Sequence, residues 1–270
     1  MNEGLLDSVV RLYAEATATL LPTLLPVALG LAGSLLTLQL AWDVAMYVVL
    51  DTDRAFGKAV RRGTVGGILY GLVTLAPTWL PEILRGFEVL GQRVSGLEGL
   101  SPSALLGQGL DLGFSMFDSW SRFLSALVPG IGAFRTAAMI FVIVAFALMA
   151  IQAARHLIEA SLALGGLVVF LGFATHRLTW PLAEGYLRHL VDLGVRIYVL
   201  FLVLSVAHDL GREWDRMLTG LTLIDPRAHF TILASAALLA LLAWTLPASI
   251  ANRLTGSFSL SGQGPLRDDA

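Results

Sequence analysis

Long intervals without Asp, Glu, Lys or Arg constrain this chain more than any other feature. A helix needs roughly 20 apolar residues to cross a bilayer, and five charge-free intervals reach or approach that length: 16–42, 63–81, 136–154, 160–176 and 230–252. A sixth, 197–208, is long enough only together with the residues just before it. Charged residues make up 14% of the sequence, against about 25% in a soluble domain. The pattern predicts an all-α, polytopic membrane protein with five or six membrane segments.

Charge, cysteine content and motifs exclude several classes of function. A net charge of −2 leaves no broad basic surface for nucleic acid. The absence of cysteine excludes thiol redox chemistry and cysteine-based metal sites. The 5 histidines are scattered and form no HExxH pattern, and the chain has no Walker loop and no GxSxG turn. We therefore expect no enzymatic activity, no cofactor and no metal site.

Composition divides the chain into five consecutive regions. These are an amphipathic helix (1–20), the first two spans (21–81), a central periplasmic or interfacial region (82–134), a C-terminal membrane bundle (135–252) and a flexible tail (253–270). The central region contains a second amphipathic helix, for which Ser101 is a good N-cap and Pro102 suits the first position. Its expected apolar face holds Leu106, Leu110, Phe117, Trp120, Phe123, Leu124 and Leu127.

The N-terminal helix carries a row of charges beside an apolar face. Glu3, Asp7, Arg11 and Glu15 recur four residues apart, and two favourable pairs contribute only about 0.2–0.5 kcal/mol each in an isolated helix. The apolar side must therefore be buried. Lipid-binding helices carry Lys or Arg on the polar face, whereas this row is mainly acidic. We expect the apolar residues Leu5, Val9 and Leu12 to contact neighbouring protein and to act in assembly.

Cationic residues predict the orientation in the membrane. Arg54, Lys58, Arg61 and Arg62 lie between the first two charge-free intervals. Because short cytoplasmic loops are enriched in Lys and Arg, we expect this loop in the cytoplasm and the N-terminus in the periplasm. The segment 160–176 is open to two interpretations. It either crosses the membrane, which puts the C-terminus outside, or re-enters on one side, which puts the C-terminus inside.

Three features suggest contacts within or between membrane helices. Gly63, Gly67 and Gly71 form two GxxxG steps, which permit close helix approach, although glycine is common here (27 residues). Asp192 and Arg196 are i, i+4 neighbours and are expected to form an intramembrane ion pair. Asp43 has two interpretations. It either marks a pathway or a partner inside the membrane, or it lies at the cytoplasmic headgroups beside an interfacial Trp42. We favour the headgroup position because Asp51 and Asp53 follow closely.

Several stretches of the sequence closely resemble the TrbL family, inner-membrane subunits of conjugative type IV secretion systems. In the second half, these are Glu-Ala-Ser at 159–161, Leu-Gly-Phe-Ala-Thr-His-Arg-Leu-Thr at 171–179, Ala-Glu-Gly-Tyr-Leu-Arg at 183–188 and Leu-Gly-Val-Arg-Ile-Tyr-Val-Leu at 193–200. Further landmarks are Leu-Ala-Trp at 40–42, Trp-Thr-Leu-Pro at 244–247 and Gly-Ser-Phe-Ser-Leu-Ser at 256–261. Family members often have a second glycine where this chain has Ala174, and Trp where it has Leu178.

The resemblance implies a non-enzymatic platform subunit in the bacterial inner membrane. Such a subunit forms a homo-oligomer, such as a pentamer, at the base of the stalk, where it supports pilus assembly and substrate passage. Its partners would be other inner-membrane, stalk and pilin subunits and membrane lipids, with translocated DNA or protein only transiently bound. The resemblance marks Gly172, Phe173, Arg177 and Thr179 as a family-motif loop. It also implies a periplasmic N-terminus, a cytoplasmic C-terminus and hence five crossings.

Two other classes of protein compete with this interpretation. A stand-alone secondary transporter or channel is disfavoured because we find no inverted repeat and few buried charges for coupling. A simple membrane anchor for another enzyme would tolerate exchange of its spans for unrelated ones.

Overall fold

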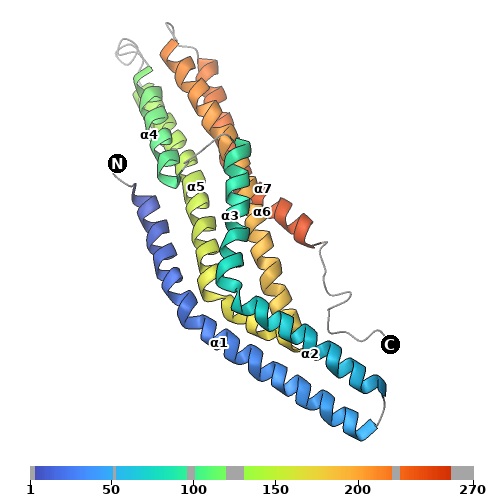
Figure 1. Ribbon diagram of the computed structural model, residues 1–270. Coiled ribbons are helices and arrows are strands. Elements are labelled where there is room, and N and C mark those ends of the chain that lie inside the picture. The colour runs from blue at the N-terminus through green and yellow to red at the C-terminus, as the bar shows by residue number, and fades with distance from the viewer. Residues whose placement is uncertain (1–3, 51–52, 96–100, 120–130, 221–225, 257–270) are drawn as a thin grey trace. The chain divides into compact units, whose positions relative to one another are not determined.

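A computed structural model describes residues 4–50, 53–95, 101–119, 131–220 and 226–256, and every regular element in these ranges is helical (Figure 1). This confirms the predicted all-α class. The elements are α1 (Leu5–Leu50), α2 (Asp53–Thr74), α3 (Ala76–Ser95), α4 (Pro102–Ser119), α5 (Ile131–Gly166), the 3₁₀ helix η1 (Val168–Thr175), α6 (Trp180–Gly220) and α7 (Pro226–Gly256).

The chain divides into two compact units, each built from stretches far apart in the sequence. Unit 1 comprises Met1–Arg11, Phe87–Leu157 and Val195–Ile250, and unit 2 comprises Leu12–Gly86, Ile158–Gly194 and Ala251–Ala270. The long helices α1, α3, α5, α6 and α7 each contribute residues to both units.

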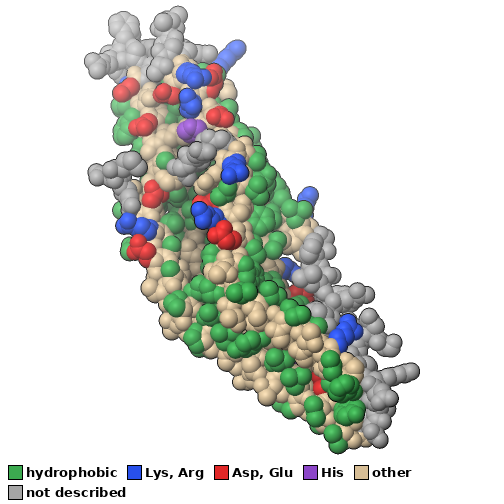
Figure 2. Space-filling model, viewed as in Figure 1, with side chains coloured by type: hydrophobic (Ala, Val, Ile, Leu, Met, Phe, Trp, Pro, Cys, Tyr) green, Lys and Arg blue, Asp and Glu red, His purple; other side chains and the backbone are tan. Residues whose placement is uncertain are grey.

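In the described ranges, four helices are long and apolar enough to span a membrane: Leu5–Val49, Gly132–Gly166, Trp180–Leu218 and His229–Gly256. The bent pair Ala59–Thr74 and Ala76–Val94 would make a fifth span if it counts as one. Figure 2 shows the hydrophobic side chains that cover much of the visible surface of α1 and α2. The chain is a multi-pass membrane protein by these criteria. The segment 160–176 is divided between the end of α5 and η1, so it forms no spanning helix of its own.

Two predicted segments have different boundaries in the structure. The interval 63–81 does not form one straight span, because the chain bends by 69° between α2 and α3. Pro77 explains the break, since proline has no N–H group to continue the hydrogen-bond pattern of α2. The N-terminal amphipathic helix is not separate from the first span. Both belong to α1, whose 46 residues extend about 69 Å at 1.5 Å per residue.

The core of unit 1 lies among α4, α5, α6 and α7. It contains Leu105, Leu112 and Met116 of α4 together with residues such as Phe146 and Leu204. The apolar face expected from the sequence is only partly the buried one: Leu106 packs against this core, whereas Leu110 is exposed. The side of α4 that carries Gly109 and Gly113 faces α5, because glycine has no side chain and permits the closer approach. The predicted residues Trp120, Phe123, Leu124 and Leu127 lie outside the described ranges.

Candidate functional site

The family-motif segment packs directly on α1 in unit 2. A Cβ atom on Gly172 would lie 2.5 Å from the carbonyl oxygen of Ala28, so only glycine lets η1 approach α1 this closely. The Thr175 hydroxyl donates a hydrogen bond to the carbonyl oxygen of Ala32 at 2.8 Å. Both alanines and Thr175 are fully buried. Since η1 has 8 residues, longer than most 3₁₀ helices, these tertiary contacts are what hold it in place.

The loop after η1 is closed by its own hydrogen bonds. The Thr179 hydroxyl donates to the carbonyl oxygen of Phe173 at 2.9 Å and to that of His176 at 3.2 Å. The backbone N–H of Leu178 donates to Nδ1 of His176 at 3.2 Å. Arg177 is exposed. Of the predicted motif residues, Gly172, Phe173 and Thr179 therefore shape the backbone, and Arg177 is the one available to a partner.

The end of α5 makes a second close contact with α1. A Cβ atom on Gly165 would overlap the backbone of Thr17. The neighbouring Gly166 has open space around it. The sequence alone does not distinguish these two glycines, because the distinction depends on which side of α5 faces α1.

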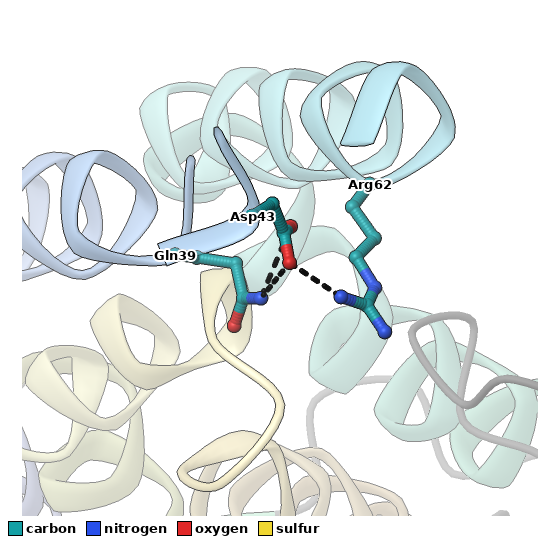
Figure 3. Close-up of polar contacts among 3 residues, drawn as sticks. All are labelled: Gln39, Asp43 and Arg62. Carbon is teal, nitrogen blue, oxygen red and sulfur yellow. Dashed lines mark hydrogen bonds and ion pairs between the residues drawn. The ribbon is translucent and has the colours of Figure 1, made fainter. Parts of the chain in front are cut away.

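A buried polar cluster connects α1 with α2 (Figure 3). Arg62 donates a hydrogen bond from Nη1 to Oδ1 of Asp43 at 2.5 Å, and the Gln39 amide donates to the same carboxylate at 3.2 Å. The Asp43 side chain is 5% exposed and that of Arg62 16%. Asp43 thus has the partner that an ionisable residue in an apolar helix requires, and this partner belongs to the cationic cluster used to predict orientation.

The predicted glycine steps on α2 face two directions. A Cβ atom on Gly63 would lie 3.1 Å from Cδ2 of Leu40, whereas Cβ atoms on Gly67 and Gly71 would meet no described heavy atom within 4 Å. Gly66, which the sequence analysis missed, is the glycine that Leu36 of α1 contacts most closely. The sequence signal for Gly66 is its position three residues after Gly63, which makes the two glycines neighbours on the helix surface. The proposed role of Gly67 and Gly71 in helix contact stays a prediction, and any contact there must come from outside the described chain.

An open apolar groove follows the junction of α1 and α2. Its volume is about 470 Å³, and its lining residues are Leu40, Val44, Tyr47, Phe56, Ala59, Val60, Gly63 and Thr64. It contains no acid–base pair or cluster suited to catalysis. Within the described ranges, no group of three or more His, Asp or Glu side chains could hold a metal ion.

The first turns of α1 belong to unit 1, in which Asp7 forms hydrogen bonds with Ser103 of α4. Leu6 packs on the core of unit 1, while Leu5, Val9 and Leu12 are 77%, 36% and 60% exposed. The predicted assembly residues therefore face away from the folded chain, and their burial against another protein stays a prediction. Glu3, the first residue of the charge row, lies outside the described residues.

Asp192 contacts the last helix of unit 2. The buried Thr255 hydroxyl donates a hydrogen bond to Oδ1 of Asp192 at 3.2 Å. This contact joins α6 to the end of α7. The ion pair expected between Asp192 and Arg196 stays a prediction.

Comparison with protein families identifies a match over most of the chain. A sequence model of the family described as TrbL/VirB6 plasmid conjugal transfer protein matches residues 36–246. The matched region includes the Gln39–Asp43–Arg62 cluster, η1 and the loop that follows it. No curated protein matches the chain.

Proposed function

The chain belongs to the TrbL/VirB6 plasmid conjugal transfer family, and from this premise we propose that it is a platform subunit of a conjugative type IV secretion system in the bacterial inner membrane. Membership of the family makes it a component of the conjugal transfer machinery. The platform role, its position at the base of the stalk and its support of pilus assembly are the proposal.

The family match over residues 36–246 carries this proposal. The contacts inside the matched region are of the kind that holds helices in fixed positions. Gly172 and Thr175 place η1 on α1, and Asp43 and Arg62 join α1 to α2. Such contacts suit a subunit that supports other proteins.

The proposed assembly is a homo-oligomer in contact with other inner-membrane, stalk and pilin subunits and with lipid. Two uncharged surfaces support this part of the proposal. One is the exposed row Leu5, Val9 and Leu12, and the other is the side of α2 that carries Gly67, where close helix approach is unobstructed. Translocated DNA or protein would contact the assembly only in passing.

The proposed orientation has a periplasmic N-terminus. It rests on the positive charges Arg54, Lys58, Arg61 and Arg62 at the start of α2. Reporter fusions test it: we expect periplasmic signals at residues 1–15 and cytoplasmic signals at 52–62. A cytoplasmic signal at the N-terminus would contradict the orientation.

The decisive experiment combines particle imaging with genetic complementation. In a donor that lacks this chain, plasmid transfer should stop and should return when the chain is supplied. The particle extracted in mild detergent should appear as a symmetric ring. Normal transfer without the chain would contradict the proposal, as would a solute-coupled current from the purified chain alone in proteoliposomes, which would favour a stand-alone transporter or channel.

A further inference from the structure

Unit 1 has two sides, and its helix contacts define them. A Cβ atom on Gly109 of α4 would overlap Phe146 of α5. On its other flank, α4 meets α6, where the Gln108 amide donates to the backbone carbonyl of His208 at 3.0 Å. Phe134 of α5 and Phe230 of α7 form a tilted aromatic contact with 5.6 Å between ring centroids. The helices α4 and α6 therefore form one side of the bundle, and α5 and α7 form the opposite side.

The side formed by α4 and α6 carries many exposed charged groups, beside exposed apolar side chains such as Phe114. On α4, Gln108, Asp111, Ser115 and Asp118 follow a 3-4-3 spacing, so they share the flank that Gln108 turns to α6. The last turns of α6 add more exposed charges. We call this set the charged side; its charged members are Asp111, Asp118, Asp209, Arg212, Glu213, Asp215 and Arg216, all exposed. Figure 2 shows blue and red side chains gathered in this part of the molecule.

The side formed by α5 and α7 is apolar. The sequence has no charged residue between Arg135 and Arg155 in α5, or between Arg227 and Arg253 in α7. Large hydrophobic side chains are exposed along both helices. We call them the apolar side; they are Ile140, Phe141, Val144, Leu148, Phe230, Leu238 and Leu241.

The charged side lies at the same level as the apolar interval of α5. The two helices run antiparallel, since the Arg135 guanidinium donates to the carbonyl oxygen of Phe117 near the end of α4. Pro102, at the start of α4, shares a small cavity with Ala153 of α5. The 18 residues of α4 extend about 27 Å, close to the roughly 30 Å of bilayer hydrocarbon. Hydropathy alone does not mark α4 as a span because of its aspartates and glycines, and the sequence accordingly predicts a periplasmic or interfacial position for it.

We propose that unit 1 lies at bilayer depth with its apolar side against lipid acyl chains and its charged side against water. Exposed carboxylates and guanidinium groups at this depth are too costly to face hydrocarbon, and in membrane proteins they face a water-filled space or the interior of a bundle. Five acidic and two basic groups leave the charged side negative, so it does not complement the phosphates of DNA. The inference concerns which surface meets lipid and does not rest on the proposed platform role.

The test uses the natural absence of cysteine in the chain. Single variants Val144→Cys and Leu241→Cys report on the apolar side, and Ser115→Cys and Arg212→Cys on the charged side. A nitroxide label is attached to the full-length protein in phosphatidylcholine–phosphatidylglycerol vesicles. Its relaxation is then measured with oxygen, which concentrates in lipid, and with a water-soluble nickel chelate.

We expect oxygen to be the stronger relaxant by severalfold at Val144 and Leu241, and the nickel chelate to be the stronger at Ser115 and Arg212. The buried control Ala236→Cys should respond weakly to both. Access of the chelate to both sides would overturn the proposal, because the bundle would then lie outside the bilayer. Dominance of oxygen on both sides, or protection of either side from both reagents, would overturn it as well.

Discussion

Asp7 and Ser103 exchange two hydrogen bonds across 96 residues of sequence. The backbone N–H of Asp7 donates to Oγ of Ser103 at 3.1 Å, and the backbone N–H of Ser103 donates to Oδ1 of Asp7 at 3.2 Å. The carboxylate therefore lies at the N-terminus of α4, where the helix dipole favours negative charge. Ser101 caps the same terminus by accepting a hydrogen bond from the N–H of Ala104, as its sequence predicts.

We expect Asp7→Ala to lower the free energy of unfolding of unit 1 by about 1 kcal/mol, in the range of a lost N-terminal cap. Asp7→Asn keeps an acceptor oxygen but loses the charge, so its effect should be smaller. Thermal unfolding in detergent measures both. Equal effects of the two substitutions would show that the acceptor contributes nothing.

A double-mutant cycle tests the pair of Asp43 and Arg62. Asp43→Leu and Arg62→Leu should each destabilise the chain by about 3 kcal/mol, because each leaves a desolvated charge without its partner. The double variant should lose less stability than the sum of the two. Strict additivity in chemical unfolding would mean that the pair is not coupled.

Gly165 and Gly166 form a matched pair of variants. Gly165→Ala places a methyl group on the backbone of Thr17, whereas Gly166→Ala enters open space. Overpacking of this kind typically costs about 1–3 kcal/mol, so we expect Gly165→Ala to lower the yield of folded protein and the plasmid transfer frequency by about tenfold, while Gly166→Ala behaves as the parent. Size-exclusion profiles and mating assays provide the measurements. Similar profiles for both variants would argue against the close contact.

Gly67→Leu should separate folding from assembly. Because a side chain at Gly67 meets no described atom of its own chain, the subunit should insert and fold normally but lose its oligomeric contact. Gly66→Leu, which collides with Leu36, should fail to fold and serves as the contrasting control. Crosslinking and native gels report the assembly. Normal assembly of Gly67→Leu would leave the glycine without a contact role.

The combined substitution Leu5→Ser, Val9→Ser and Leu12→Ser should abolish complex assembly but leave membrane insertion intact, since all three side chains are exposed. Leu6→Ser is the matched control: it packs on the core of unit 1 and should lower stability instead. Copurification with stalk subunits and carbonate extraction of membranes distinguish the two effects. Intact assembly of the triple variant would remove the proposed role of this helix.

Local sequence was sufficient for features that depend on a single helix. The charge-free intervals determined the helical membrane class because only apolar helices of sufficient length are stable across hydrocarbon. Ser101 and Pro102 similarly determined the start of α4. Pro77 is also a local signal for the bend, but the charge-free interval 63–81 suggested one continuous span.

Tertiary structure decided which side of each helix makes contact. On α4, both the face with Leu106 and the face with Leu105 are apolar, and the close approach of Gly109 to α5 selects between them. Likewise, the sequence identified Asp43 as costly in the membrane, but only the antiparallel packing of α1 and α2 brings Arg62 to it. Hydrophobicity is a property of each segment, whereas the rotation and partner of a helix depend on side-chain fit to residues distant in the sequence.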